Sequence, residues 1–287
     1  MDRHDPAWLD RQYNNRARIP EHAEIFERWD RASALAVEGQ SRRLDVRYGD
    51  GPSETLDIYP TTAERAPVFV FIHGGYWRAF DKSNHAFVAP AFVHAGAMVV
   101  VPNYALCPSV TIDHIGLQLV RALAWTWRHA ALYGGDPRRI VVAGHSAGGH
   151  LAAMLLACDW KAVSRDLPAD LVRRALAISG LFDLEPLRHT PFLQGDLRLT
   201  PESVQRLSPA RFPAPRGTLY AAVGALESEE FLRQNALIRE RWGAAAVPVC
   251  ETVPGTHHLS VVHELVDSNA RLHALARDLL DLPGQAG

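Results

Sequence analysis

The sequence predicts an α/β protein in which a mostly parallel, eight-stranded sheet is covered by helices on both faces. Short apolar, β-branched runs alternate with longer amphipathic stretches along nearly the whole chain, which is typical of a parallel sheet between helices. The 287 residues and the apolar fraction of 47% are enough for one large core. A Gly-x-Ser-x-Gly segment also lies between an apolar run and a helical stretch, where a strand-to-helix turn is expected.

The first two strands are expected to form a half-exposed antiparallel pair. Arg43–Tyr48 and Thr55–Tyr59 alternate apolar and polar residues, and Gly49-Asp50-Gly51-Pro52 supplies the turn between them. The later strands are mostly apolar, as expected for parallel strands buried on both faces. They are predicted at Val68–Ile72, Ala97–Val101, Ile140–Ala143, Ala175–Ile178, Thr218–Val223 and Val247–Val253.

Helical patterning precedes the first strand and fills the segments between strands. Residues 1–40 form a predicted N-terminal helical extension, followed by one α/β domain over residues 41–287. Residues 183–215 are rich in proline and interrupt the alternation. We expect a small cap over the active site there, because variable loops on a rigid scaffold are where specificity is built. The other helices are predicted at Asn84–Ala95, Asp113–Tyr133, Ala147–Cys158, Glu229–Trp242 and Leu259–Leu282.

Composition narrows the functional class. A net charge of −2 without a basic or acidic block argues against a nucleic acid or an anionic membrane as partner. Cys107, Cys158 and Cys250 lie in unrelated contexts, which is typical of reduced thiols. The polar N-terminus and the lack of a long apolar run favour a soluble, cytoplasmic protein. A small-molecule substrate fits this composition, and a homodimer is compatible with it because symmetric dimers are common.

Gly144-His145-Ser146-Ala147-Gly148 is the most informative segment of the chain. In a tight strand-to-helix turn, a side chain at either glycine position would collide with neighbouring backbone. The same turn pushes the Ser146 hydroxyl out of the sheet, and the helix N-terminus behind it offers free N–H groups to a developing negative charge. The segment therefore predicts Ser146 as a nucleophile on an α/β-hydrolase fold.

The general base is expected near the C-terminal end of the sequence. Serine needs a base within hydrogen-bond reach, and in this fold the acid and then the histidine follow the serine, each after a later strand. His257 and His258 both follow the last predicted strand. Spacing alone does not choose between them, but closeness to the start of the final helix favours His258.

The acid is expected after the strand Thr218–Val223, where three glutamates follow. Glu229 and Glu230 are expected to be solvated carboxylates in the first turn of a helix. Glu227 lies on the loop before that helix and is favoured, because its side chain can turn inward. Asp183 is the alternative, since an acid after the preceding strand can also reach the histidine.

The segment His73-Gly74-Gly75-Tyr76-Trp77 directly follows the strand Val68–Ile72. It matches the His-Gly-Gly motif that supplies one side of an oxyanion hole, and glycine lets the main chain approach the substrate oxygen closely. His73 is expected to anchor this loop. The predicted oxyanion-hole donors are the N–H groups of Gly74, Gly75 and Ala147. The predicted pocket residues are Tyr76, Trp77, Phe80, His145 and Phe182, although the four aromatic residues among them could equally belong to the core.

No metal or cofactor site is expected. His257, His258 and His263 lie close together in sequence, but no carboxylate or cysteine has a zinc-like spacing to them.

Several longer motifs resemble the arylformamidase (kynurenine formamidase) branch of the α/β-hydrolase superfamily, close to the hormone-sensitive-lipase-like esterases. The most specific are Ser179-Gly180-Leu181-Phe182-Asp183-Leu184-Glu185-Pro186 and Glu230-Phe231-Leu232-Arg233-Gln234. The others are Tyr48–Gly51, Leu56–Tyr59, His73–Trp77 and Gly144–Met154. The family acid and histidine align with Glu227 and His258, although animal members have aspartate where this chain has Glu227.

The resemblance implies a cofactor-free serine hydrolase that cleaves a small acyl group from an aryl amide or ester through an acyl-enzyme. N-Formyl-kynurenine-like arylformamides are the favoured substrates, which would place the protein in tryptophan catabolism. The alternative within enzymes is a short-chain carboxylesterase or acetylhydrolase with little formamidase activity. The alternative from another class is a non-catalytic binding protein on the same fold.

Overall fold

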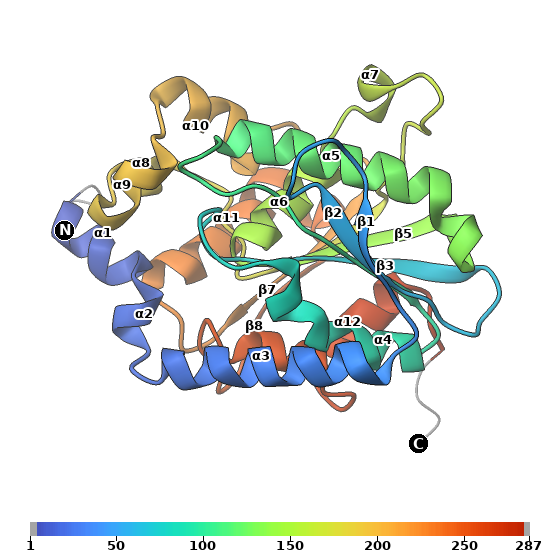
Figure 1. Cartoon of the computed structure of the whole chain (residues 1–287). Helices are drawn as coiled ribbons and strands as arrows, with labels where there is room; N and C mark the ends of the chain where they lie inside the picture. The colour runs from blue at the N-terminus through green and yellow to red at the C-terminus, as the bar shows by residue number, and fades with distance from the viewer. Residues whose placement is uncertain (1–4, 284–287) are drawn as a thin grey trace.

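Eight strands form one sheet in the order β1-β2-β4-β3-β5-β6-β7-β8 (Figure 1). The structure is a computed structural model, and it describes residues 5–283. All eight predicted strands are present. Their ends lie within two residues of the predicted ends, except that β5 begins five residues earlier than predicted. The strands are β1 (Arg43–Arg47), β2 (Thr55–Tyr59), β3 (Ala66–Ile72), β4 (Met98–Pro102), β5 (Gly135–His145), β6 (Arg174–Ile178), β7 (Thr218–Gly224) and β8 (Val249–Val253).

The pairing directions confirm the predicted α/β-hydrolase fold. Strand β2 runs antiparallel to both β1 and β4. The pairs from β4 through β8 are parallel. Parallel strands end on the same edge of a sheet, so the loops after β3, β5, β7 and β8 meet there. Ligands of open α/β sheets bind outside this edge.

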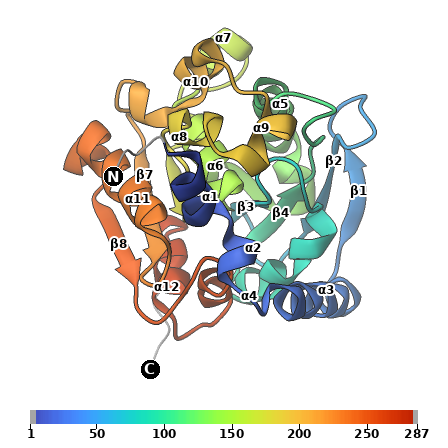
Figure 2. The ribbon, with the colours of Figure 1, turned by 90° about the vertical axis from the view of Figure 1, so that its left-hand side faces the viewer.

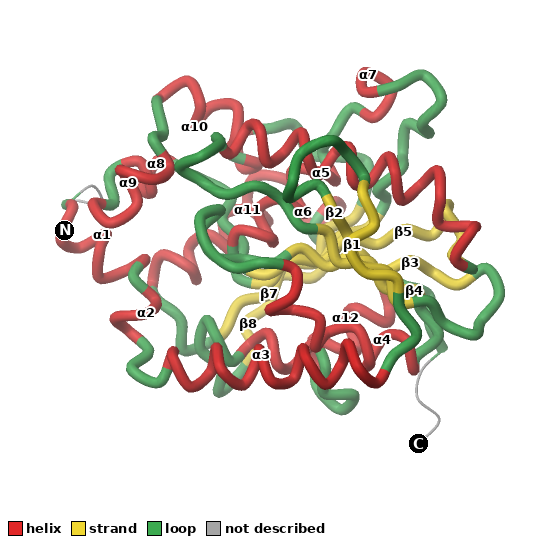
Figure 3. Tube along the Cα trace, viewed as in Figure 1, coloured by secondary structure: helices red, strands yellow, loops and turns green. Residues whose placement is uncertain are grey.

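Two helical layers enclose the sheet, as the separation of helices (red) and strands (yellow) in Figure 3 makes visible. Side chains of β3 alternate between two cores, with Val68 and Val70 on one face and Phe69 and Phe71 on the other. The first face is covered by α5 (Ile112–His129), α6 (Ala147–Leu156) and α11 (Glu229–Ala246). The second is covered by α3 (His22–Gly39), α4 (Ala89–His94) and α12 (Arg271–Leu279). Shorter segments are η2 (Ala130–Tyr133) and α7 (Trp160–Val163).

Three helices precede the sheet. They are α1 (Pro6–Tyr13), α2 (Asn15–Arg18) and α3, which lie within the predicted extension over residues 1–40. Figure 2 places α1 between α11 and the helices of residues 183–215, and α1 contacts both. The latter helices are α8 (Glu185–Arg188), α9 (Pro191–Leu197), α10 (Pro201–Leu207) and η3 (Pro209–Arg211). The outer ends of the predicted extension and domain, residues 1–4 and 284–287, lie outside the described residues.

Two of the predicted helices are wrong in detail. The segment Leu259–Leu282 is not one helix but a short 3-10 turn, η4 (Val261–Leu265), followed by α12. The break comes at Asp267, whose carboxylate accepts a hydrogen bond from the Asn269 N–H at 2.9 Å, and such local bonds compete with a helix. The segment Asn84–Ala95 begins as a 3-10 helix, η1 (Lys82–Val88), before α4. Pro90 at the start of α4 has no N–H with which to continue the preceding turn.

Candidate active site

Ser146 occupies a sharp turn between β5 and α6. Its backbone has φ 58° and ψ −118°, a strained conformation for a residue with a side chain, which costs about 1–3 kcal/mol. Both flanking glycines are needed sterically. A Cβ at Gly144 would lie 2.2 Å from the Gly148 carbonyl oxygen, and one at Gly148 would lie 2.0 Å from the Ile72 carbonyl oxygen. The strain is therefore held by close backbone packing on both sides.

Three predicted side chains meet beside this turn. The His258 Nδ1–H donates to Glu227 Oε2 at 2.6 Å, and the Ser146 hydroxyl lies 3.1 Å from His258 Nε2. The three residues follow β5, β7 and β8, in the order serine, acid, histidine. Ser146 is 3% exposed, and the side chains of His258 and Glu227 are 5% and 0% exposed. Such an arrangement can pass a proton from a serine hydroxyl to an imidazole that a carboxylate orients.

Glu227 is fixed by contacts on its other oxygen. Oε1 accepts hydrogen bonds from the Gly224 N–H at 2.8 Å and from the Ser179 hydroxyl at 2.5 Å. Ser179 directly follows β6 and has a left-handed backbone with φ 51°. Ser179 belongs to a motif of the sequence, but nothing in that motif indicates its contact with Glu227.

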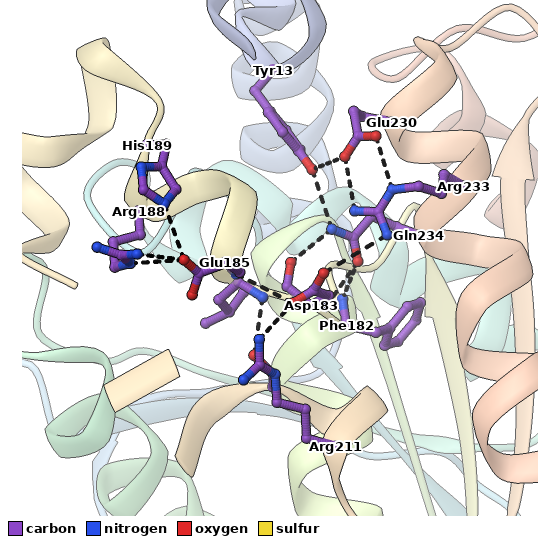
Figure 4. A network of polar contacts seen from close by, with 12 residues as sticks. Tyr13, Phe182, Asp183, Glu185, Arg188, His189, Arg211, Glu230, Arg233 and Gln234 are labelled. Carbon is purple, nitrogen blue, oxygen red and sulfur yellow. Dashed lines mark hydrogen bonds and ion pairs between the residues drawn. The ribbon is translucent and has the colours of Figure 1, made fainter. Parts of the chain in front are cut away.

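Asp183 does not reach the histidine. Its carboxylate faces Arg211 at 3.6 Å and Arg233 at 3.8 Å, and it accepts a hydrogen bond from the Glu185 N–H at 3.3 Å. Figure 4 shows Asp183 within this cluster of polar side chains. The geometry therefore favours Glu227 over the alternative acid.

Glu230 was expected to be solvated, and this expectation is wrong, because the residue is 2% exposed. Its carboxylate accepts two hydrogen bonds from Arg233, each at 2.8 Å, and one from the Tyr13 hydroxyl at 2.8 Å (Figure 4). Helix α1 covers the first turn of α11. Sequence patterning could not reveal that cover, since Tyr13 and Glu230 are 217 residues apart.

The other two histidines considered with His258 have separate structural partners. His257 Nδ1 accepts hydrogen bonds from the Leu259 and Ser260 N–H groups, each at 3.2 Å. His263 Nε2 accepts one from the Trp29 indole at 2.9 Å. Within residues 5–283, no group of three or more histidine, cysteine or acidic side chains could hold a metal ion.

The His-Gly-Gly loop lies directly beside the serine. A Cβ at Gly74 would lie 3.1 Å from Ser146 Cβ, so a larger residue there would crowd Ser146. Among the described residues, no acceptor takes the N–H of Gly75 or of Ala147. His73 is fully buried and stacks on Tyr104 at 4.2 Å, whose hydroxyl donates to the His73 carbonyl at 2.9 Å. Burial lowers the pKa of His73 to about 4, as befits a neutral residue that anchors the loop.

A pocket of about 580 Å³ opens over Ser146 and His258. Of the five predicted pocket residues, Tyr76, Phe80 and His145 line it. Trp77 and Phe182 do not, and both are fully buried in the core. The Trp77 ring packs edge-on against His150 at 5.0 Å, while the Phe182 ring packs against Gly180. Trp77 has a left-handed backbone with φ 55°. Its side chain therefore points into the core, while the side chain of the preceding Tyr76 lines the pocket.

His145 supports the loop that holds the histidine. Its Nε2–H donates to the His258 carbonyl oxygen at 2.8 Å. Burial and the neighbouring His258 lower the pKa of His145 well below its usual range. A neutral imidazole therefore lies beside Ser146.

The remaining pocket walls were not predicted. The extension before the sheet contributes Asn15, Arg16, Phe26 and Trp29, and α9 contributes Phe192. The aromatic residues within 1–40 were a visible signal, but their direction toward the site depends on how α1–α3 pack.

Comparison with known proteins places the chain among hydrolases. It is 31% identical to kynurenine formamidase of Danio rerio over 252 residues, which cover 85% of this chain and 82% of the relative. It is also 31% identical to kynurenine formamidase of Salmo salar over 272 residues, covering 91% and 87%. The chain belongs to the kynurenine formamidase family. This confirms the resemblance inferred from the motifs.

Other similarities agree with a hydrolase of the arylformamidase or esterase type. The BD-FAE family model matches residues 56–167. A crystal structure of a candidate thioesterase from Silicibacter superposes with a TM-score of 0.82 at 31% identity, covering 93% of this chain and 98% of that one. The carboxylesterase EstE1, from a metagenomic library, superposes with a TM-score of 0.69 at 19% identity and shares the fold. Residues 5–283 of this family member contain no helix with the length and hydropathy of a membrane span.

Proposed function

We propose that the protein is a serine hydrolase that removes a small acyl group from an aryl amide or ester, with N-formyl-kynurenine-like arylformamides as the favoured substrates. The observation that supports this most directly is the hydrogen-bonded series Ser146–His258–Glu227 at the pocket. Membership in the kynurenine formamidase family supports the substrate class.

The proposed reaction has two steps. Ser146 Oγ attacks the formyl carbonyl while its proton moves to His258 Nε2, and Glu227 stabilises the imidazolium that forms. His258 then gives this proton to the departing aryl amine, which leaves a formyl ester on Ser146. In the second step His258 takes a proton from water, whose oxygen attacks the ester and releases formate. The serine recovers its proton from His258.

The tetrahedral oxyanion would be held by the backbone N–H groups of Gly74, Gly75 and Ala147. The unpaired N–H groups of Gly75 and Ala147 support this proposal, as does the close approach of Gly74 to Ser146. Donors of this kind are typically worth about 2.7–4 kcal/mol each to the transition state. No cofactor is required by these steps.

The second candidate function is a short-chain carboxylesterase with little formamidase activity. Relatives named esterases favour it, such as esterase LipQ of Mycobacterium tuberculosis, which is 39% identical over 116 residues. Both candidate reactions would use Ser146, but their leaving groups differ. An aryl amine must be protonated as it leaves, whereas an alcohol needs this proton less.

One experiment separates the candidates. We would measure kcat/KM for N-formyl-kynurenine beside p-nitrophenyl acetate and butyrate, with Ser146→Ala as the blank. A formamide value well above both ester values is expected. Ester turnover with negligible formamide turnover would reassign the protein as a small-acyl esterase. Retained activity in Ser146→Ala would contradict the serine mechanism, and failure of the intact protein to label with a fluorophosphonate would favour the non-catalytic binding protein.

We also propose the cellular location, the partners and the domain division of the enzyme. The net charge of −2 and the three free thiols support a cytoplasmic enzyme with a small-molecule substrate and no nucleic-acid or membrane partner. The helices before β1 and those between β6 and β7 support a division into an extension over 1–40 and a hydrolase domain over 41–287 with a cap at 183–215. A homodimer stays a prediction.

A further inference from the structure

The pocket over Ser146 has one wall that does not come from the sheet or its loops. Asn14, Asn15 and Arg16 line it from α2 and the residue before that helix, and Phe26 and Trp29 line it from α3. The N-terminal extension thus completes the pocket in which the substrate would lie.

Three charged residues line this pocket, and two of them neutralise one another. Arg78 forms an ion pair with Asp196 and lies over the Phe192 ring at 5.3 Å. Arg16 has no carboxylate partner among the described residues, and its guanidinium lies 5.5 Å from the centre of the Phe26 ring. The pocket therefore carries one uncompensated positive charge, located on the extension.

A second donor beside Arg16 also lacks a partner. Asn15 is 8% exposed, and its side-chain nitrogen has no hydrogen bond among the described residues. A buried amide without a partner costs about 1–3 kcal/mol, so a ligand that reaches Asn15 would recover part of that cost. Phe26 and Trp29 add an apolar, aromatic surface next to these two polar residues.

From this combination we infer that Arg16 is a specificity-determining residue that binds a carboxylate on the leaving-group side of the substrate. A guanidinium matches a carboxylate with two parallel hydrogen bonds, and Asn15 supplies a further donor. The aromatic surface then covers the aryl ring of the same substrate. This inference rests on the proposed function and narrows its substrate class to aryl formamides or esters whose leaving group bears a carboxylate.

The extension is held in place by the network in Figure 4. The Tyr13 hydroxyl donates to Glu230 Oε2 at 2.8 Å and accepts from Gln234 Nε2 at 3.2 Å, while its ring packs edge-on against Phe231 at 5.7 Å. The Tyr13 carbonyl accepts a hydrogen bond from the Tyr76 hydroxyl at 2.7 Å. Arg16 follows this anchor by three residues, so its backbone has a defined position at the pocket.

The test compares a substrate that bears a carboxylate with the carboxamide that lacks this one negative charge. N-Formyl-kynurenine and its carboxamide form one pair, and 3-(4-acetoxyphenyl)propanoate and its carboxamide form an ester pair. We expect the wild-type protein to prefer the acid in kcat/KM at low ionic strength. Arg16→Gln should reduce the acid-to-carboxamide ratio by about tenfold, the scale of one charge-assisted hydrogen bond. The matched control is Arg18→Gln, since Arg18 is exposed on the same helix but does not line the pocket.

Binding measurements separate this inference from the proposed chemistry. In a Ser146→Ala background, the dissociation constant of each acid should rise by about tenfold on Arg16→Gln, while that of each carboxamide should change less. This comparison needs no turnover, so it stands even if the serine mechanism fails. An acid-to-carboxamide ratio that is the same in Arg16→Gln and Arg18→Gln, in binding and in turnover, would overturn the assignment.

Discussion

Replacing Glu227 by glutamine tests the acid of the proposed triad without changing its size. Glu227 Oε1 accepts a hydrogen bond from the Gly224 N–H, and this backbone donor cannot become an acceptor. The glutamine oxygen must therefore stay on that side, and its NH₂ group must face His258 Nδ1. The imidazole can then accept at Nδ1 only if it carries its proton on Nε2, facing Ser146. In that tautomer His258 has no lone pair for the serine proton.

The size of the effect follows from this forced tautomer. In serine proteases, exchange of the triad carboxylate for an amide lowers kcat by about 10⁴. Here the 2.6 Å contact between His258 and Glu227 is buried, so water cannot substitute for the carboxylate. We expect kcat to fall by about 10³–10⁴, equivalent to about 4–5.5 kcal/mol of transition-state stabilisation.

The assay is kcat for N-formyl-kynurenine and p-nitrophenyl acetate, with circular dichroism to confirm folding. Asp183→Asn is the matched control, because Asp183 bears the alternative carboxylate but faces Arg211 and Arg233 at more than 3.5 Å. Its kcat should stay within about threefold of wild type, as expected for loose ion pairs. A folded Glu227→Gln protein with near wild-type kcat, or a crippled Asp183→Asn protein, would refute the reasoning.

Three further predictions concern stability. Tyr13→Phe removes the hydroxyl that donates to the buried Glu230 and should lower the free energy of unfolding in urea by about 1–2 kcal/mol; an unchanged value would mean that this contact does not anchor the extension. Burial lowers the pKa of His150 to about 4, so below about pH 6.5 the unfolded chain binds a proton that the folded protein excludes, and stability is lost as the pH falls from 6.5 toward 4. The Tm of His150→Gln should decrease less between pH 7 and pH 5 than the Tm of the wild type. An equal decrease would contradict the lowered pKa of His150 as a cause of the pH dependence. Gly148→Ala should destabilise the fold by about 1–3 kcal/mol in thermal melts, because its Cβ would lie 2.0 Å from a backbone carbonyl oxygen of β3. The control is Gly116→Ala in α5, which has open space around it and should be neutral or stabilising.

The sheet and the proposed nucleophile could be predicted because their signals are local. A buried parallel strand is apolar along its length, as Val68–Ile72 is, and a strand-to-helix elbow needs glycine on both sides of Ser146. His258 and Glu227 followed from the order in which strands end at one edge. For the strands and the elbow, a few consecutive residues determine the conformation, whereas the places of His258 and Glu227 depend on the topology of the fold.

Features that depend on packing between distant segments were not predictable in the same way. Tyr76 and Trp77 both have a left-handed backbone, with φ 49° and 55°. This conformation decides which of the two side chains faces the pocket, and the sequence does not predict it. His258 also does not lie at the start of the final helix, as was expected, since α12 begins only at Arg271. His258 is positioned instead by β8 and by the hydrogen bond from His145 to its carbonyl.

The first turn of α11 joins the proposed chemistry to the proposed recognition of the substrate. Glu227 precedes this turn and orients His258, while Glu230 lies within it and anchors Tyr13 of the extension. Between them, the Ser228 hydroxyl accepts a hydrogen bond from the Phe231 N–H at 3.4 Å, and the Phe231 ring packs against His258 at 4.4 Å. A shift of this turn would therefore displace the proposed triad acid and the pocket wall that bears Arg16 together. Because the two functions share one rigid element, changes in this turn should alter kcat and KM jointly, whereas changes at Arg16 alone should act on the choice of substrate.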